Sequence, residues 1–466
     1  MPPSPAVAPL PPTAPTSGYP NHPELLQERE TRTKHVARTF PVNGRAVHLE
    51  GHSMNLTVEP TDGDQATITI DLEYWSRSDE WMDLVDDEFD VIVDERSLVV
   101  DISGARMPER DESWWRRIFG RNREVSWAID ATLRVPAGTE LRIENRYGDV
   151  DIDGVGGELT VDNSSGEVIV RDSGNTTIHN AYSAVTVRGS GELRIRASSS
   201  AVSVEDVAGD ADIETSYDTL TVENVQGDLR AVANSGEVRV AGVSGMAEVT
   251  NSYARAEIRA VGSLRFRGSS SAVEVRGVGG AADIESSYES VTVEDVEGRL
   301  EVNSPSGAVT IAGTRGDISV TNSYAPVRVS DIGGHASVDA SSASVTVTDA
   351  ASAEVSTSYS GVEIRGVSGP VEVRNQSGRI ELAGLRGDAL TASHSLRTSY
   401  ADIEVEWPAG TPLALDAEAT YGQIRSDFSG QLEESSSSTR RFVSEATGGG
   451  RMILVASSGS IVIRGR

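Results

Sequence analysis

The sequence predicts an all-β fold: a single-stranded parallel β-helix, or β-solenoid, with about 17 to 18 residues per coil. The first observation is a phrase that recurs eight times from NRYGDVDIDGV onward, with tyrosines 35 or 36 residues apart except for a last interval of 41. The second is a similar phrase between successive tyrosine phrases, such as SSGEVIV, with a small residue in place of tyrosine. The third is the lack of a sustained 3.6-residue period, so we expect few helices.

Each unit reads as short strands separated by a glycine corner, as in LTVENVQGDLRAV at 220–232. Alternation of apolar and polar residues over three to five positions indicates a strand with one buried face, and glycine permits the sharp turn. Such a coil has room for two or three strands around a narrow core of Val, Ile, Leu and Ala. We assign 136–430 to the solenoid, where about 16 to 17 coils would form a rod about 80 Å long.

One corner of the coils is expected to carry a column of tyrosines. The structural interpretation is that each ring packs over the neighbouring coil, where the alternate phrase supplies only Gly, Ser or Ala. The functional interpretation is a line of phenols that binds sugar rings. The column consists of Tyr147, Tyr182, Tyr217, Tyr253, Tyr288, Tyr324, Tyr359 and Tyr400.

A second column stands two residues before each tyrosine. Its side chains can form hydrogen bonds, and we expect them to satisfy backbone groups that the turn leaves unpaired. The column consists of Asn145, Asn180, Thr215, Asn251, Ser286, Asn322, Thr357 and Thr398.

The two ends of the chain differ from the repeat. Residues 1–35 are expected to be a disordered tail, because 1–23 hold nine of the eighteen prolines. Residues 36–135 alternate in the manner of strands and hold five of the six tryptophans, which predicts a β-rich region that caps the first coil. At the other end, 431–447 break the period and are expected to form a loop, and 448–466 return to it as strands of a terminal coil.

The segment 109–125 is a local anomaly, because aromatic and basic residues gather there in an acidic chain. This composition is typical of a docking loop or an interfacial membrane anchor. The alternative is a loop folded over the cap, with its arginines paired to the acidic run 83–90. The candidate docking residues are Trp114, Trp115, Arg116, Arg117, Ile118, Phe119, Arg121 and Arg123.

Composition excludes several classes of function. The 41 basic and 71 acidic residues give a formal charge of −30, which disfavours nucleic acid as a partner. The chain has no cysteine, and this excludes disulfides, thiolate metal sites and cysteine nucleophiles. No segment is apolar and long enough to span a bilayer. Proline interrupts each candidate secretory signal, so a natural start at Met1 would imply a cytoplasmic protein.

Three motifs suggest sites that their context does not support. The run from Asp149 to Gly154 opens like a calcium loop, but Thr160 stands where a bidentate Glu is needed. The RGD tripeptides at 315–317 and 386–388 fall where other units carry a V-x-G-D corner. His48 and His52 have a zinc spacing on a helix but not on a strand. We therefore predict no catalytic residue, no metal ligand and no cofactor.

Two passages carry a family resemblance: TLRVPAGTELRIENRYGDVDIDGVGGELTVDNSSGEVIV at 132–170, and YGQIRSDFSG with GGGRMILVASSGSIVIRGR within 421–466. They resemble the bacterial adhesin-like family called domain of unknown function 4097, and the likeness covers most of 40–466. The resemblance implies a β-solenoid of a bacterial, often envelope-associated protein, and it supplies no catalytic residues.

The leading hypothesis is a non-catalytic, adhesin-like rod, a structural or interaction protein of the bacterial cell envelope, whose contacts with a protein or polysaccharide surface are multivalent. One alternative is a self-assembling β-helical scaffold joined end to end through uncapped coils. The other is a carbohydrate-active β-helix enzyme, a lyase or hydrolase. Such enzymes usually build a groove from long loops, and the coils from 140 to 390 are too short for such loops.

Overall fold

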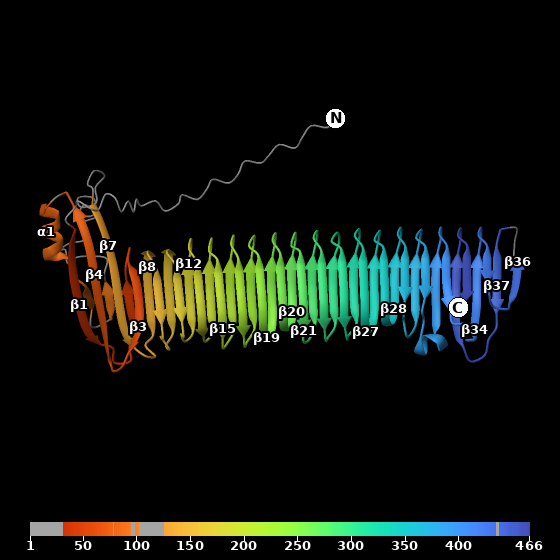
Figure 1. The fold of residues 1–466 in the computed structure, drawn as a ribbon, viewed down its shortest axis with the longest axis horizontal. Helices are drawn as coiled ribbons and strands as arrows, with labels where there is room; N and C mark the ends of the chain where they lie inside the picture. Colours follow the sequence, from red (N-terminus) through yellow and green to blue (C-terminus); the bar gives the residue numbers. More distant parts are fainter. Residues whose placement is uncertain (1–30, 78, 95–97, 102–124, 435–437) are drawn as a thin grey trace, which may run out of the picture.

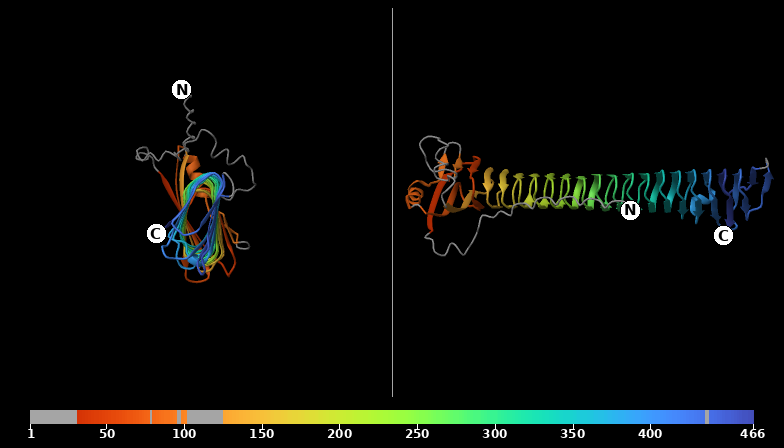
Figure 2. Two further views of the ribbon diagram at one scale, coloured as in Figure 1. Left: turned by 90° about the vertical axis from the view of Figure 1, so that its right-hand side faces the viewer. Right: turned by 90° about the horizontal axis from the view of Figure 1, so that it is seen from above.

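The computed structural model describes residues 31–77, 79–94, 98–101, 125–434 and 438–466. These form a long rod of stacked coils with a β-rich cap at the N-terminal end (Figure 1). The structure confirms the predicted parallel β-solenoid. Each regular coil has two strands, one on each broad face of a flattened tube that Figure 2 shows end-on.

The first face is made by the strands that lead into the tyrosine corner. They are β8 (Leu141–Tyr147), β10 (Leu159–Ser165), β12 (Thr176–Asn180), β14 (Leu193–Ala197), β16 (Ala211–Thr215), β18 (Leu229–Ala233), β22 (Ala282–Ser286), β24 (Leu300–Ser304), β26 (Ile318–Asn322) and β30 (Val371–Asn375).

The second face is made by the strands that leave this corner. They are β9 (Val150–Asp153), β11 (Val168–Arg171), β13 (Val185–Ser190), β15 (Val202–Val207), β17 (Leu220–Val225), β21 (Val273–Val278), β23 (Val291–Val296), β25 (Val309–Thr314), β29 (Val362–Arg365) and β31 (Ile380–Ala383). Four longer strands continue from the second face to the first: β19 (Val238–Asn251), β20 (Ala256–Gly268), β27 (Val327–Ala340) and β28 (Val345–Thr357).

Stacking in register explains why this short repeat folds. Parallel pairing places each apolar residue on the equivalent one of the next coil, as when Leu159 lies on Leu141 and Val161 on Ile143. These side chains point inward and are fully or almost fully buried. A single coil buries its apolar side only against its neighbours, so the core is continuous along the rod.

The N-terminal end closes the solenoid with strands that run out of sequence order. The coil made by β2 (Val47–Glu50) and β3 (Asn55–Thr61) lies directly against β8 and β9. Outside it lie β6 (Val99–Asp101), its antiparallel neighbour β5 (Ile92–Asp94), and β7 (Val125–Pro136). At the N-terminal end of the rod, the two outermost strands of the second face pair in the antiparallel direction. They are β4 (Gln65–Ser76), which pairs with β7, and β1 (Arg32–Pro41), which pairs with β4.

The helix α1 (Asp79–Glu88) packs on this cap. Arg32 on β1 makes ion pairs with Asp83 and Asp86 at 2.8 and 2.7 Å, and the Tyr74 hydroxyl donates a hydrogen bond to Asp86. Because β1 begins at Arg32, the final residues of the expected tail, 1–35, belong to the cap. Pairing with β4 and with the helix supplies the partners that this basic segment lacks on its own.

The C-terminal end is also built out of order. The coil of β32 (Ser393–Thr398) and β33 (Ile403–Trp407) is followed in space by β38 (Gly450–Ala456) and β39 (Ile461–Gly465). Only then come β34 (Leu413–Ala419) and β35 (Ile424–Ser426), which precede them in the chain. The terminal coil is thus inserted between two earlier ones.

One departure from expectation lies here. Within the segment expected to be a loop, 431–447, the structure has a hairpin of β36 (Gln431–Glu434) and β37 (Arg440–Ser444), and β37 pairs antiparallel with β34. Hydrogen bonding to the open edge of β34 supplies a partner that local sequence does not show. The regular series from β8 to β31 has about 14 coils, and the coils of β32 and β33 and of β34 and β35 follow it before residue 430, after η1 (Gly387–Thr391).

Candidate functional site

The most regular surface feature is an edge on which tyrosine and serine alternate coil by coil. Parallel pairing places Ser165 on Tyr147, and the backbone bonds from Ser199 to Ala181 and from Ser235 to Ser216 continue the same register. We call this the Tyr–Ser edge. Its serines between the tyrosines are Ser165, Ser199, Ser235, Ser270, Ser306, Ser342, Ser377 and Ser458.

The edge contains a ninth tyrosine, Tyr421, that the repeat spacing did not reveal. The amide of Ser458 donates to Ser399, and the amide of Tyr421 donates to Ser457. The spatial order is therefore Tyr400, Ser458, Tyr421, so the alternation continues although the chain order is reversed. Tyr421 joins the Tyr–Ser edge only because the terminal coil, which carries Ser458, is inserted between the coils of Tyr400 and Tyr421.

The nine rings are exposed. Between 54% and 75% of each of these tyrosines is accessible to solvent. Each tyrosine thus offers most of its surface to solvent, and this surface is available to a partner. With about 4.8 Å per coil, the rings repeat about every 9.6 Å along the rod.

Buried polar side chains fix the backbone beneath the rings. Asn322 donates to the carbonyls of Ser304 and Gly307 at 2.6 and 2.8 Å, and Thr215 donates to Ser200 at 3.1 Å. These side chains satisfy turn carbonyls, as expected, and bond to the backbone of the preceding corner. The whole column is buried: Asn145, Asn180, Thr215, Asn251, Ser286, Asn322, Thr357 and Thr398.

Glycine keeps neighbouring corners in close contact. A Cβ added at Gly307 would lie 1.8 Å from the carbonyl oxygen of Glu289, and one at Gly378 would lie 1.8 Å from that of Ser360. Both glycines directly follow a serine of the edge. These two corners therefore have no room for a side chain at the glycine, so a substitution there would push neighbouring coils apart.

The edge is almost free of charge in a chain of net charge −30. From Tyr147 to Tyr421, the sequence neighbours of the tyrosines and intervening serines are charged only at Arg146, Asp218 and Glu289. The other neighbours are Ser, Thr, Ala, Gly, Asn, Gln or Pro. Many charged side chains lie instead on the broad faces, where arginines pair with carboxylates of adjacent coils, as Arg196 does with Asp212 at 2.6 Å.

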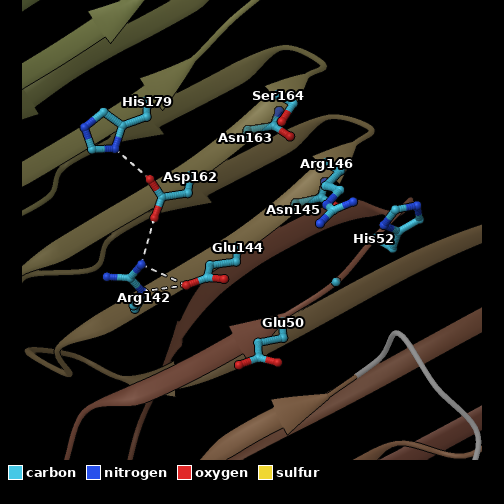
Figure 3. Close-up of a pocket in the computed structure, with 11 residues that line it drawn as sticks. Glu50, His52, Arg142, Glu144, Asn145, Arg146, Asp162, Asn163, Ser164 and His179 are labelled. Atoms are coloured by element: carbon cyan, nitrogen blue, oxygen red, sulfur yellow. Dashed lines mark hydrogen bonds and ion pairs between the residues drawn. The ribbon is translucent and has the colours of Figure 1, made fainter. Parts of the chain in front are cut away.

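An open pocket of about 730 Å³ adjoins the N-terminal end of the edge on the first face (Figure 3). A chain of contacts crosses it: His179 to Asp162 at 2.6 Å, Asp162 to Arg142 at 3.1 Å, and Arg142 to Glu144 at 2.9 Å. Because Arg142 engages both carboxylates, they form an ion-pair network, unlike the separated acid and base of a glycosidase.

His52 lies at the rim of this pocket and contacts the first ring of the edge. Its ring and that of Tyr147 meet edge to face, with centroids 5.7 Å apart. Burial, together with the nearby charge of Arg146, lowers the pKa of His52. The imidazole is therefore neutral at pH 7, so the contact with Tyr147 is one between uncharged rings.

Comparison with known families gives a match to the C-terminal part of the chain. Residues 260–464 match the family model described as Toastrack DUF4097. This part of the rod is a Toastrack DUF4097 domain. The sequence resemblance to this family is thereby confirmed for the C-terminal part of the chain. Neither the curated proteins nor the solved structures contain a match to the chain.

The Toastrack domain carries the C-terminal part of the Tyr–Ser edge: Tyr288, Tyr324, Tyr359, Tyr400 and Tyr421. The same column continues without a change of interval into the coils before residue 260. The edge is therefore a property of the entire rod.

Both RGD tripeptides lie in the Toastrack domain, and side chains of both are engaged within the solenoid. Asp317 accepts a hydrogen bond from the amide of His335 at 2.8 Å, and Arg315 pairs with Glu297 at 2.7 Å. Arg386 pairs with Asp349 at 2.7 Å. The tripeptide at 315–317 thus lies at a corner between β25 and β26, as interpreted, whereas Gly387 and Asp388 of the second belong to η1.

The structure also shows where the two histidines with a zinc spacing lie. His48 contacts Glu50 and Glu144 at 3.6 and 3.3 Å, whereas His52 faces Tyr147. Among the described residues, no group of three or more His, Asp or Glu could hold a metal ion. In the same part of the chain, no helix is both long and apolar enough to cross a membrane. The candidate docking residues of 109–123 lie outside the described residues.

Proposed function

We propose that this protein is a non-catalytic, adhesin-like interaction rod that binds an extended partner along the Tyr–Ser edge. The observation that carries the proposal is the register of nine exposed tyrosines along one edge. Each ring offers a small contact area, but contacts repeated on a rigid support act together and raise the overall affinity. The resemblance to envelope proteins supports a place in the bacterial envelope, which is part of this proposal.

The pocket and the ends favour this function over the two alternatives. In the pocket, the carboxylates of Glu144 and Asp162 are both paired with Arg142, which does not suit the general acid of a hydrolase. At the C-terminal end, β37 covers the edge of β34, which an end-to-end scaffold would need open.

A series of variants tests the proposal. Two, four or eight tyrosines of the edge are changed to serine, the residue already present at the same corner of alternate coils. Retention of each variant is measured on a panel of immobilised neutral and acidic polysaccharides and on bacterial cell walls. We expect at least one of these polymers to retain the wild-type protein. Retention on that polymer should fall with two, four and eight substitutions, and the fall should become steeper at each step. Equal retention of all variants on each polymer would contradict the proposal, as would release of reducing sugar during binding.

A further inference from the structure

The spacing and the neutrality of the Tyr–Ser edge together indicate what kind of polymer fits it. Resting on the proposed function, we infer that the partner is a neutral, straight, β-1,4-linked glycan chain that lies parallel to the rod axis. Three features of the described residues lead to this class: the interval between rings, the hydrogen-bonding groups beside them, and the charge distribution.

The interval matches a two-sugar repeat. In a straight β-1,4-linked glycan each sugar is turned over relative to the one before, so every second ring presents the same face to one side. The length of that two-sugar repeat is close to two coil rises, about 9.6 Å. A run of neighbouring tyrosines can therefore stack on equivalent sugars, and each intervening coil, with serine in place of tyrosine, leaves room for the sugar between.

Polar groups that suit sugar hydroxyls line the edge. A shallow hollow of about 300 Å³ lies beside it, and its lining includes Ser252, Ser269, Ser287 and Asn303, together with Arg267 and Glu285, which pair with each other at 3.2 Å. Two of these serines directly precede Tyr253 and Tyr288 in the chain. Hydroxyl and amide groups beside an aromatic face can bond to the equatorial hydroxyls of a stacked sugar.

Charge separates this class from other partners. The chain carries −30, so an acidic polysaccharide, a nucleic acid or an anionic lipid surface would be repelled. A second copy of the chain would carry the same charge. A neutral polymer avoids this repulsion, and covering the nearly uncharged edge requires the desolvation of few ions.

The first experiment measures binding to cellulose and chitin powders, with starch and polygalacturonate as controls. The variant carries Tyr253→Ser, Tyr288→Ser, Tyr324→Ser and Tyr359→Ser, and the matched control carries Phe at the same four positions. We expect binding to the β-1,4-linked glycans, a loss of about tenfold or more with serine, and near-complete retention with phenylalanine. Circular dichroism verifies that each variant keeps its strands.

The second experiment changes the interval and keeps the number of rings. Deleting one coil, 218–235, retains all nine tyrosines but places Tyr217 and Tyr253 on adjacent coils. Deleting two coils, 218–253, removes one tyrosine and preserves the interval. We expect the one-coil deletion to bind the glycan more weakly than the two-coil deletion, although it has more tyrosines. The reverse order would overturn the inference of a matched repeat.

The remaining outcomes separate the ligand class from the proposed function. Tyrosine-dependent binding to starch or polygalacturonate, or tyrosine-dependent dimers in sedimentation, would overturn the glycan assignment and leave the edge as an interaction surface. Binding to cellulose that the serine variant retains would also overturn it. If no polymer binds in a tyrosine-dependent way and no dimer forms, both proposals fail.

Discussion

At the scale of single residues, this fold depends on buried polar side chains that form hydrogen bonds with backbone groups. Asn322 and its counterparts satisfy turn carbonyls, and His394 joins the irregular C-terminal coil to its neighbour. The amide of Val371 donates to Nδ1 of His394 at 3.2 Å, and Nε2 lies 2.8 Å from the carbonyl of Ala389. This pattern fixes the neutral tautomer with the proton on Nε2.

His394 should make stability depend on pH. Burial lowers its pKa below the ordinary value of 6.5, so below about pH 6.5 the unfolded chain binds more protons than the folded one. The contribution of neutral His394 to the free energy of unfolding is fully present above that pH, and it decreases as the pH falls. We expect the thermal midpoint of the wild type to drop more between pH 7 and pH 5 than that of His394→Gln. Parallel pH profiles would refute this assignment.

Asn322→Ala should destabilise the rod by about 1–3 kcal/mol, because the buried carbonyls of Ser304 and Gly307 each lose a hydrogen bond from the Asn322 side chain. Asn322→Thr should lose less, since threonine occupies the equivalent position at Thr215 and bonds to Ser200. Chemical denaturation measures both values, and Asn303→Ala on the exposed face serves as the control. A loss for Asn322→Ala no greater than for this control would show that the buried bonds contribute nothing.

At the scale of elements, the corner between two strands decides how closely coils approach. Strand pairing fixes register, but it leaves the corner free to take different shapes. At the Tyr–Ser edge, glycines such as Gly307 allow a carbonyl of the preceding coil to enter the space of a side chain. At such corners, the close contact between neighbouring coils therefore depends on the absence of a side chain.

Gly307→Ala should separate two corners and destabilise the protein by about 1–3 kcal/mol, since its Cβ would lie 1.8 Å from the Glu289 oxygen. The matched control is Gly361→Ala, where the nearest atom is the Arg379 oxygen at 3.6 Å. Denaturation midpoints compare the two variants. Equal midpoints would mean that the corner relaxes without cost.

At the scale of the whole molecule, both ends of the rod place a coil out of sequence order. At the N-terminal end β3 lies between β9 and β7, and at the C-terminal end β38 lies between β32 and β34. In each arrangement, a strand near one end of the chain has a hydrogen-bonded neighbour on both sides. Such a strand cannot separate from the rod without breaking two ladders of hydrogen bonds, so the ends resist fraying. Antiparallel strands then cover the outermost parallel ones.

Replacing 431–444 by a short Gly/Ser linker should expose the edge of β34 and cause concentration-dependent association, which sedimentation velocity would detect. The control is Arg441→Ala, which removes a two-bond contact with Asp416, 2.8 Å for each bond, but keeps the hairpin. That contact lowers the pKa of Asp416, yet it is exposed, and its loss should cost less than about 1 kcal/mol. A linker variant that stays monomeric would show that the hairpin does not protect this edge.

The sequence by itself determined the coil, its strands and the column from Tyr147 to Tyr400. A period of 17 to 18 residues with alternating apolar positions can bury its apolar side only by stacking in register, so local pattern and global fold coincide. Even the buried Asn and Thr positions followed from the repeat.

Only the tertiary structure decided the ends and the completeness of the edge. The hairpin at 431–444 and the place of Tyr421 depend on which strand edges remain open after the regular coils have stacked. That is a property of the assembled rod: hydrogen bonding to an open edge joins segments that are distant in sequence, and the periodicity of neither segment encodes the choice.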